Sequence, residues 1–187
     1  LSPSNSLANC LLIAMPSLAD GKFAHSVTLI CEHSERGALG IVLNKPLEMK
    51  LGDVLAQMQL EATEVAIGER AVLRGGPVHT DRGFVLHQPA GKWQSTIAVH
   101  GDTALTTSKD VLEAVARGEG PEKMLVALGY AGWTAGQLEE EMAKNAWLSV
   151  KATDSVIFDL PNADKLNAAM SLLGVSFGQL SEQAGHA

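Results

Sequence analysis

Short apolar segments rich in β-branched residues, each bounded by turn-forming residues, are the feature that most constrains the fold. Cys10–Met15, Ser26–His33 and Ala38–Asn44 are of this kind, and the turn-forming stretch Ser34–Gly37 joins the second to the third. Such runs predict strands, and the last two predict a hairpin. Strands that follow one another in hairpins favour an antiparallel sheet over alternating βαβ units.

Helical patterns are interspersed among these strands instead of alternating strictly with them. Four segments combine apolar residues at helical spacing with capping residues or a terminal glycine: Leu51–Leu60, Thr107–Gly118, Thr134–Lys144 and Leu166–Gly174. Met124–Gly132 is an almost continuous apolar run, typical of a central strand, and Ser155–Pro161 is expected to form a strand or strand fragment. We therefore expect an α+β fold with a mixed, largely antiparallel sheet flanked by helices.

The length of 187 residues predicts a single domain, 1–187, in which 1–9 form a loose N-terminal segment. No stretch approaches the ~20 apolar residues of a membrane span, and Cys10–Met15 is too short for a signal peptide. Cys10 and Cys31 fit no disulfide framework and are expected to be reduced. These features predict a cytoplasmic protein.

Net charge argues against direct contact with nucleic acids. The formal charge is −7 and the pI is about 5.3, while the 14 Lys and Arg residues are scattered along the chain. A molecule of this charge is repelled by phosphate backbones unless it carries a local basic patch. Direct binding to DNA or RNA is therefore the least favoured function.

Sequence motifs for metals, nucleotides and covalent catalysis are absent. The six histidines include no His-x-x-x-His pair, and neither cysteine has a partner at ligand spacing. Gly-x-Ser-x-Gly, Ser-x-x-Lys, Gly-x-Gly-x-x-Gly and phosphate-binding loop motifs are also missing. We expect no metal and no cofactor.

The stretch Arg74–His87 contains two glycines and a proline, which suit a sharp turn at the end of a strand. Asp81, Arg82 and His87 follow and could supply an acceptor, a permanent cation and a titratable ring to a ligand. A turn whose charged residues form intramolecular ion pairs is the alternative, and it is the more common outcome.

Glu32 and His33 end one predicted strand, and Asn44 ends the next, so all three are candidate ligand contacts. Alternation along the strand places Cys31 and His33 on the same face. Their side chains would lie about 6–7 Å apart, too far for the imidazole to activate the thiol unless the strand is bulged. A buried structural cysteine is the favoured interpretation.

Glycines bracket a predicted strand-to-helix turn in Gly129–Glu139, where free backbone N–H groups could bind an anion. Thr134 and Gln137 stand at capping spacing and could satisfy those donors without a ligand. Trp133 is either a core residue or a pocket wall. Trp133 and Gln137 complete the set of candidate ligand contacts.

Several phrases, in order along nearly the whole chain, resemble the bacterial YqgE/AlgH family: IAMP, GALGIVLNKP, GGPV followed by DRGFVLH, TTSKDVL, GPEK, LGYAGWTAGQLE and NAWL. The resemblance implies an α+β domain with a bifurcated, partly barrel-like sheet surrounded by helices. Members of this largely uncharacterised family are linked to control of alginate production, which implies a regulatory role, and the resemblance supplies no catalytic residues.

Three functional hypotheses follow. The first is a non-catalytic regulatory or interaction protein acting through a small ligand or a protein partner. The second is an enzyme for a small molecule in which His33, Asp81 or His87 acts as acid or base and Arg82 holds an anionic substrate. The third is a transcriptional regulator that binds nucleic acid directly.

Overall fold

The computed structural model describes residues 6–15 and 23–174. Ten strands lie in this part of the chain: β1 (Cys10–Ala14), β2 (Val27–Ser34), β3 (Gly37–Val42), β4 (Pro46–Lys50), β5 (Ala71–Arg74), β6 (Val78–Gln88), β7 (Thr96–His100), β8 (Thr103–Thr106), β9 (Lys123–Thr134) and β10 (Trp147–Lys151). Five α-helices accompany them: α1 (Leu51–Gln57), α2 (Val65–Gly68), α3 (Lys109–Ala116), α4 (Gln137–Ala143) and α5 (Lys165–Leu173). None of the described helices is long and apolar enough to cross a membrane.

The sheet divides at the long strand β9. Neighbouring strands follow the order β10-β1-β2-β3-β9-β6-β8-β7, while β5 also lies parallel to β9 and β4 pairs with β5. The first half of β9 lies between β5 and β6, and its second half pairs with β3. The expected α+β fold with a mixed, largely antiparallel sheet is confirmed, and the sheet is not closed into a barrel.

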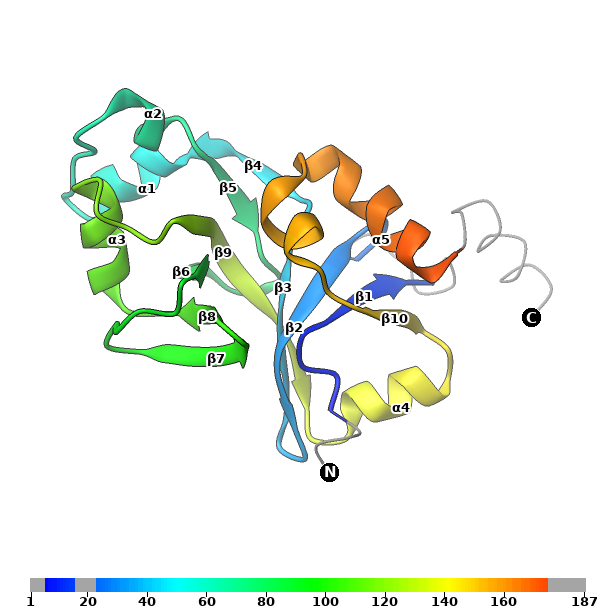
Figure 1. The fold of residues 1–187 in the computed structure, drawn as a ribbon. Helices are drawn as coiled ribbons and strands as arrows, with labels where there is room; N and C mark the ends of the chain where they lie inside the picture. Colours follow the sequence, from blue (N-terminus) through cyan, green and yellow to red (C-terminus); the bar gives the residue numbers. More distant parts are fainter. Residues whose placement is uncertain (1–5, 16–22, 175–187) are drawn as a thin grey trace.

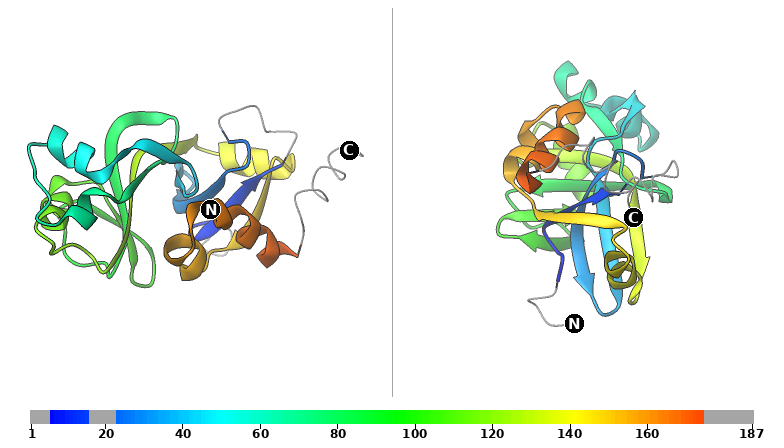
Figure 2. Two further views of the ribbon diagram at one scale, coloured as in Figure 1. Left: turned by 90° about the horizontal axis from the view of Figure 1, so that it is seen from above. Right: turned by 90° about the vertical axis from the view of Figure 1, so that its right-hand side faces the viewer.

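Two lobes result from this division. Lobe 1 contains β1–β3 and β10 with α4 and α5, lobe 2 contains β4–β8 with α1–α3, and β9 runs through both (Figure 1). A view from above shows the two groups of elements side by side (Figure 2). A central cluster of strand residues from both lobes, joined by Ala169 and Met170 of α5, fills the space between them.

Gly75 and Gly76 carry the chain across β9, since β5 and β6 pair with opposite edges of that strand. The Gly75 N–H donates to the carbonyl oxygen of Leu128 at 2.9 Å. A Cβ atom on Gly76 would lie 2.1 Å from the carbonyl carbon of Tyr130, and no side chain fits there. The two glycines therefore form the expected turn, and close passage over another strand is what requires them.

Four of the five described α-helices lie where apolar spacing and capping residues predict them. Gly118 and Gly174 follow α3 and α5 with φ angles of 79° and 76°, as expected for glycines that end helices. Glu140 of α4 and the helix-ending residue Lys144, one turn apart, form an ion pair at 3.1 Å. Short-range signals were sufficient for these elements.

The expected strand at Ser155–Pro161 is wrong. Residues Ser155–Asp159 form a single π-helical turn. The adjacent residues Val156 and Ile157 are both buried in the central cluster, 3% and 1% exposed. Successive residues of a strand point to opposite faces, so a helical turn is what lets both reach one core.

Part of the predicted loose segment 1–9 lies outside the described residues. Within the described part, the Asn9 N–H donates to the carbonyl oxygen of Ile30 at 2.8 Å, and the Leu7 N–H bonds to His33. Residues 6–9 therefore run along β2.

Candidate functional site

A β-bulge in β2 separates Cys31 from His33. The register with β3 shifts between Ile30 and Glu32, which inserts Cys31 as an extra residue. Cys31 packs in the central cluster, whereas His33 turns toward α4 on the other face. The expectation that the two side chains share a face is therefore wrong. Burial raises the pKa of the Cys31 thiol, which leaves it unreactive.

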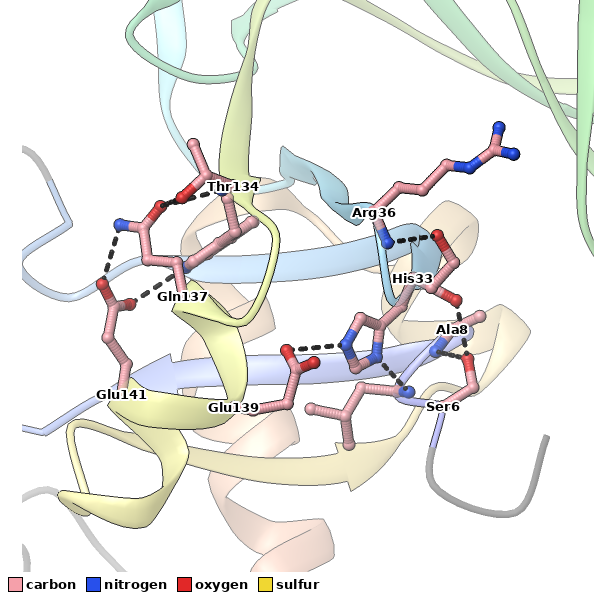
Figure 3. Close-up of polar contacts among 11 residues, drawn as sticks. Ser6, Ala8, His33, Arg36, Thr134, Gln137, Glu139 and Glu141 are labelled. Atoms are coloured by element: carbon pink, nitrogen blue, oxygen red, sulfur yellow. Dashed lines mark hydrogen bonds and ion pairs between the residues drawn. The ribbon is translucent and has the colours of Figure 1, made fainter. Parts of the chain in front are cut away.

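His33 links β2 to the N-terminal residues and to α4 (Figure 3). Its Nδ1 accepts a hydrogen bond from the Leu7 N–H at 2.9 Å, so Nε2 carries the proton and donates to Glu139 Oε1 at 3.1 Å. The imidazole is 1% exposed, and its hydrogen bond is the main cause that lowers the pKa of Glu139. Both ring nitrogens are thus used within the protein.

Glu141 of α4 joins side chains of the strand-to-helix turn and of β10 into one hydrogen-bond network. Its Oε1 accepts hydrogen bonds from the indole N–H groups of Trp133 and Trp147, at 3.0 and 2.8 Å. Its Oε2 accepts from Gln137 Nε2 at 3.0 Å, and Gln137 Oε1 accepts from the Thr134 N–H at 2.9 Å (Figure 3). Trp133 is therefore a core residue, and Gln137 is the predicted cap.

Neither Glu139 nor Glu141 was expected to have a role. The spacing of Gln137 and Glu141 by four residues is the one signal in the sequence, because side chains one helical turn apart can interact. Their partners His33, Trp133 and Trp147 lie on three different strands, which the fold brings next to α4.

Asn44 holds the base of the β2–β3 hairpin. Its Oδ1 accepts from the Val27 N–H at 3.0 Å, and its Nδ2 donates to the carbonyl oxygen of His25 at 2.9 Å. These bonds use both ends of the amide for structure.

His87 lies inside lobe 2 and is 0% exposed. Its Nδ1 donates to the carbonyl oxygen of Pro89 at 2.9 Å, so Nε2 accepts the hydrogen bond from the Thr106 hydroxyl at 2.7 Å. Burial lowers the pKa of His87, which keeps the ring neutral near pH 7. His87 is therefore a satisfied core residue and does not face a cavity.

Asp81 and Arg82 lie on a wide bulge of β6. Val78 pairs with Tyr130 of β9, but the next pair joins Gly83 to Leu128, so 79–82 leave the ladder and are exposed. The guanidinium carbon of Arg82 lies 5.8 Å from the centre of the Phe84 ring, whose side chain belongs to the central cluster. That cation–π contact holds the arginine head over the Phe84 ring.

Asp81 lines a compact pocket between β6 and α3, which we call the β6–α3 pocket. Its volume is about 310 Å³, and it is lined by Val54, Gln57, Met58, Asp81, Arg82, Gly83, Val85, Thr106, Thr107, Ser108, Lys109, Leu112 and Leu128. The floor is apolar: Val54, Val85 and Leu112 are buried in the core beneath α1 and α3. Small-molecule sites typically combine such a floor with a few polar groups.

Four polar side chains border the β6–α3 pocket without partners among the described residues: Gln57, Asp81, Thr107 and Lys109. Asp81 and Lys109 are exposed and do not form an ion pair with each other. Asp110, in contrast, already binds the first-turn Val111 N–H at 3.0 Å and the Gln94 N–H at 2.9 Å. The free hydrogen-bonding capacity therefore belongs to the side chains at the rim.

Two wider hollows flank the tip of the β2–β3 hairpin. One, of about 1040 Å³, is lined in part by His33 and by the β7–β8 turn, and the other, of about 870 Å³, is lined in part by Glu32 and Trp133. Asp81 lines neither of them. The structure thus does not gather the eight predicted residues at one site.

The acid–base set of the enzyme hypothesis is dispersed in the same way. The His33 ring is buried beneath α4, and His87 is buried in lobe 2. Asp81 lies on the rim of the β6–α3 pocket. Within residues 6–15 and 23–174, no three His, Cys, Asp or Glu side chains are grouped to hold a metal ion.

Comparison with known proteins identifies the family. A family model described as AlgH-like matches residues 11–178. A UPF0301 protein of Thiobacillus denitrificans is 54% identical over 181 residues, covering 97% of both chains, and one of Nitrosospira multiformis is 51% identical with the same coverage.

Two solved structures have a similar fold. The AlgH protein of Pseudomonas aeruginosa is 48% identical, with a TM-score of 0.82 over 100% of this chain and 99% of that one. A Corynebacterium diphtheriae protein, 21% identical, has a TM-score of 0.67 over 89% of this chain and 86% of its own, which shows a shared fold alone. By its sequence and its fold, the chain belongs to the AlgH-like family.

Proposed function

We propose that this protein is a non-catalytic regulatory protein that binds a small molecule in the β6–α3 pocket. One observation carries the proposal: a compact pocket of about 310 Å³ joins an apolar floor to four rim side chains that lack partners in the described chain. Polar groups with unused hydrogen bonds beside apolar surface are what a ligand needs for orientation and for affinity.

A regulatory role fits the dispersal of the candidate acid and base groups. A ligand in the β6–α3 pocket would contact α1, α3 and the β6 bulge together, because residues of all three line it. A ligand that binds only the folded state stabilises it. The cytoplasmic location expected from the sequence features stays a prediction. So does a role in the control of alginate production, which the YqgE/AlgH resemblance implies.

A thermal-shift screen against amino acids, organic acids, sugars, nucleotides and metal salts tests this proposal. A compound present at about 100 times its dissociation constant adds about 2.7 kcal/mol to the free energy of unfolding. Asp81→Asn and Lys109→Ala should each weaken a true ligand about 10-fold, which reduces the added stability to about 1.4 kcal/mol at the same concentration. Lys92→Ala is the matched control, because Lys92 is exposed and does not line the pocket.

Two outcomes would overturn the proposal. If no compound in the screen gives a shift that depends on Asp81 or Lys109, the pocket is not a ligand site. If a ligand is recovered chemically changed after incubation with the wild type but not with Lys109→Ala, the protein is an enzyme.

A further inference from the structure

Apart from Arg82, whose guanidinium lies over the Phe84 ring, the β6–α3 pocket has one acid and one base among its lining residues. Asp81 of the β6 bulge and Lys109 of α3 both line it, are both exposed, and form no ion pair with each other or with other described residues. An ion pair between exposed side chains adds only about 0–1 kcal/mol, so such charges stay hydrated where they are not paired. The pocket therefore holds two complementary charges that a ligand carrying both signs can bridge.

From this arrangement we infer that the ligand is a zwitterion with an apolar side chain, the chemistry of an apolar α-amino acid. The inference rests on the proposed function and names the ligand class for the same pocket. Lys109 binds the carboxylate, Asp81 accepts from the ammonium group, and the side chain lies on Val54, Val85 and Leu112.

Size and net charge agree with this class. A volume of about 310 Å³ lies at the lower end of the range for ligand pockets, about 300–1,000 Å³, and suits a small metabolite. The protein carries a formal charge of −7, so a simple anion meets long-range repulsion that a neutral zwitterion does not. Met58 on the pocket wall is flexible enough to fit side chains of different shape.

Calorimetric titration with three matched probes tests the ligand class. L-Leucine carries both charges, 4-methylpentanoate lacks the ammonium group, and 3-methylbutylamine lacks the carboxylate. We expect leucine to bind about 10-fold or more tightly than either single-charge analogue, the usual effect of losing one charged hydrogen bond. Glycine, which has no apolar side chain, should bind more weakly than leucine by a similar factor.

Variants assign each charge to its residue. Asp81→Asn should weaken leucine binding about 10-fold and leave 4-methylpentanoate unchanged, while Lys109→Ala should weaken both. Lys92→Ala, outside the pocket, should bind leucine as the wild type does. Circular dichroism and melting temperature check that each variant is folded, which is expected because all three side chains are exposed.

The outcomes separate this inference from the function on which it rests. If 4-methylpentanoate binds as tightly as leucine, or if leucine binding survives Asp81→Asn, the zwitterion inference is wrong but a ligand pocket remains. If none of the probes binds while the wider screen yields a ligand dependent on Lys109, the ligand class is again wrong. If the screen yields no such ligand, the proposed function fails with it.

Discussion

Lys165, the first residue of α5, is a buried cation whose ionisation should be measurable in protein stability. The residue is 0% exposed, and its Nζ donates to the carbonyl oxygen of Leu43 at 3.1 Å. Removal from water lowers the pKa of Lys165 from 10.5 to about 8. Each pKa unit corresponds to about 1.4 kcal/mol, so burial of the charged form opposes folding by about 3 kcal/mol below pH 8.

The sign of the pH dependence follows from the depressed pKa. Below pH 8 the lysine is protonated in both the folded and the unfolded state, and the free-energy cost of burying its charge is fully present. Between pH 8 and 10.5 the folded state has lost the proton while the unfolded state retains it, so stability rises with pH. A methionine at this position has a similar length and no charge, so Lys165→Met should lack this rise.

Urea denaturation of the wild type and Lys165→Met from pH 7 to pH 11 measures the effect. The wild type should gain about 3 kcal/mol relative to the variant across the titration. Lys92→Met, at an exposed position, is the control and should show no such gain. The argument is refuted if the difference in free energy of unfolding between the wild type and Lys165→Met stays constant with pH. Lys165 would then titrate as a hydrated lysine does.

Three further predictions concern the glycine crossing and the buried polar groups. Gly76→Ala should lower the free energy of unfolding by about 4 kcal/mol or more in chemical denaturation, because its Cβ would meet the β9 backbone. Gly101 also has a positive φ but has open space around it, so Gly101→Ala should lower the free energy of unfolding by only about 1–2 kcal/mol. Glu141→Ala should cost about 2 kcal/mol or more, because two buried indole N–H groups lose their acceptor, and equal stability in urea would contradict the network. The pKa of His87 is lowered, so the wild type should lose stability relative to His87→Gln as pH falls below 6.5, and parallel pH profiles would count against a buried neutral ring.

Local patterns in the sequence were enough to predict most elements but not their contacts. The apolar stripe of α5 and its terminal Gly174 are short-range signals, and the helix lies where they predict it. The bulge at Cys31 has no such signal, because it arises from the register between β2 and β3. One inserted residue moves every later side chain of β2 to the other face, which is why His33 meets α4.

The candidate site shows the same limit. Asp81 was expected to bind a ligand and lies on the pocket rim, whereas neighbouring Arg82 packs over Phe84. Arg82 is also among the residues that line the pocket, but its guanidinium is engaged by the Phe84 ring. Lys109 was not a candidate, because its proximity to Asp81 depends on how α3 packs on lobe 2.

The most direct test of the central claim is an NMR titration of ¹⁵N-labelled protein with L-leucine and, in parallel, with each compound that stabilises the protein in the thermal-shift screen. If a small molecule binds in the β6–α3 pocket, the amide signals of Gly83, Thr107 and Lys109 should shift in a saturable manner with at least one of these probes. Shifts confined to the hollows around Glu32 or His33, or no saturable shifts at all, would contradict the claim.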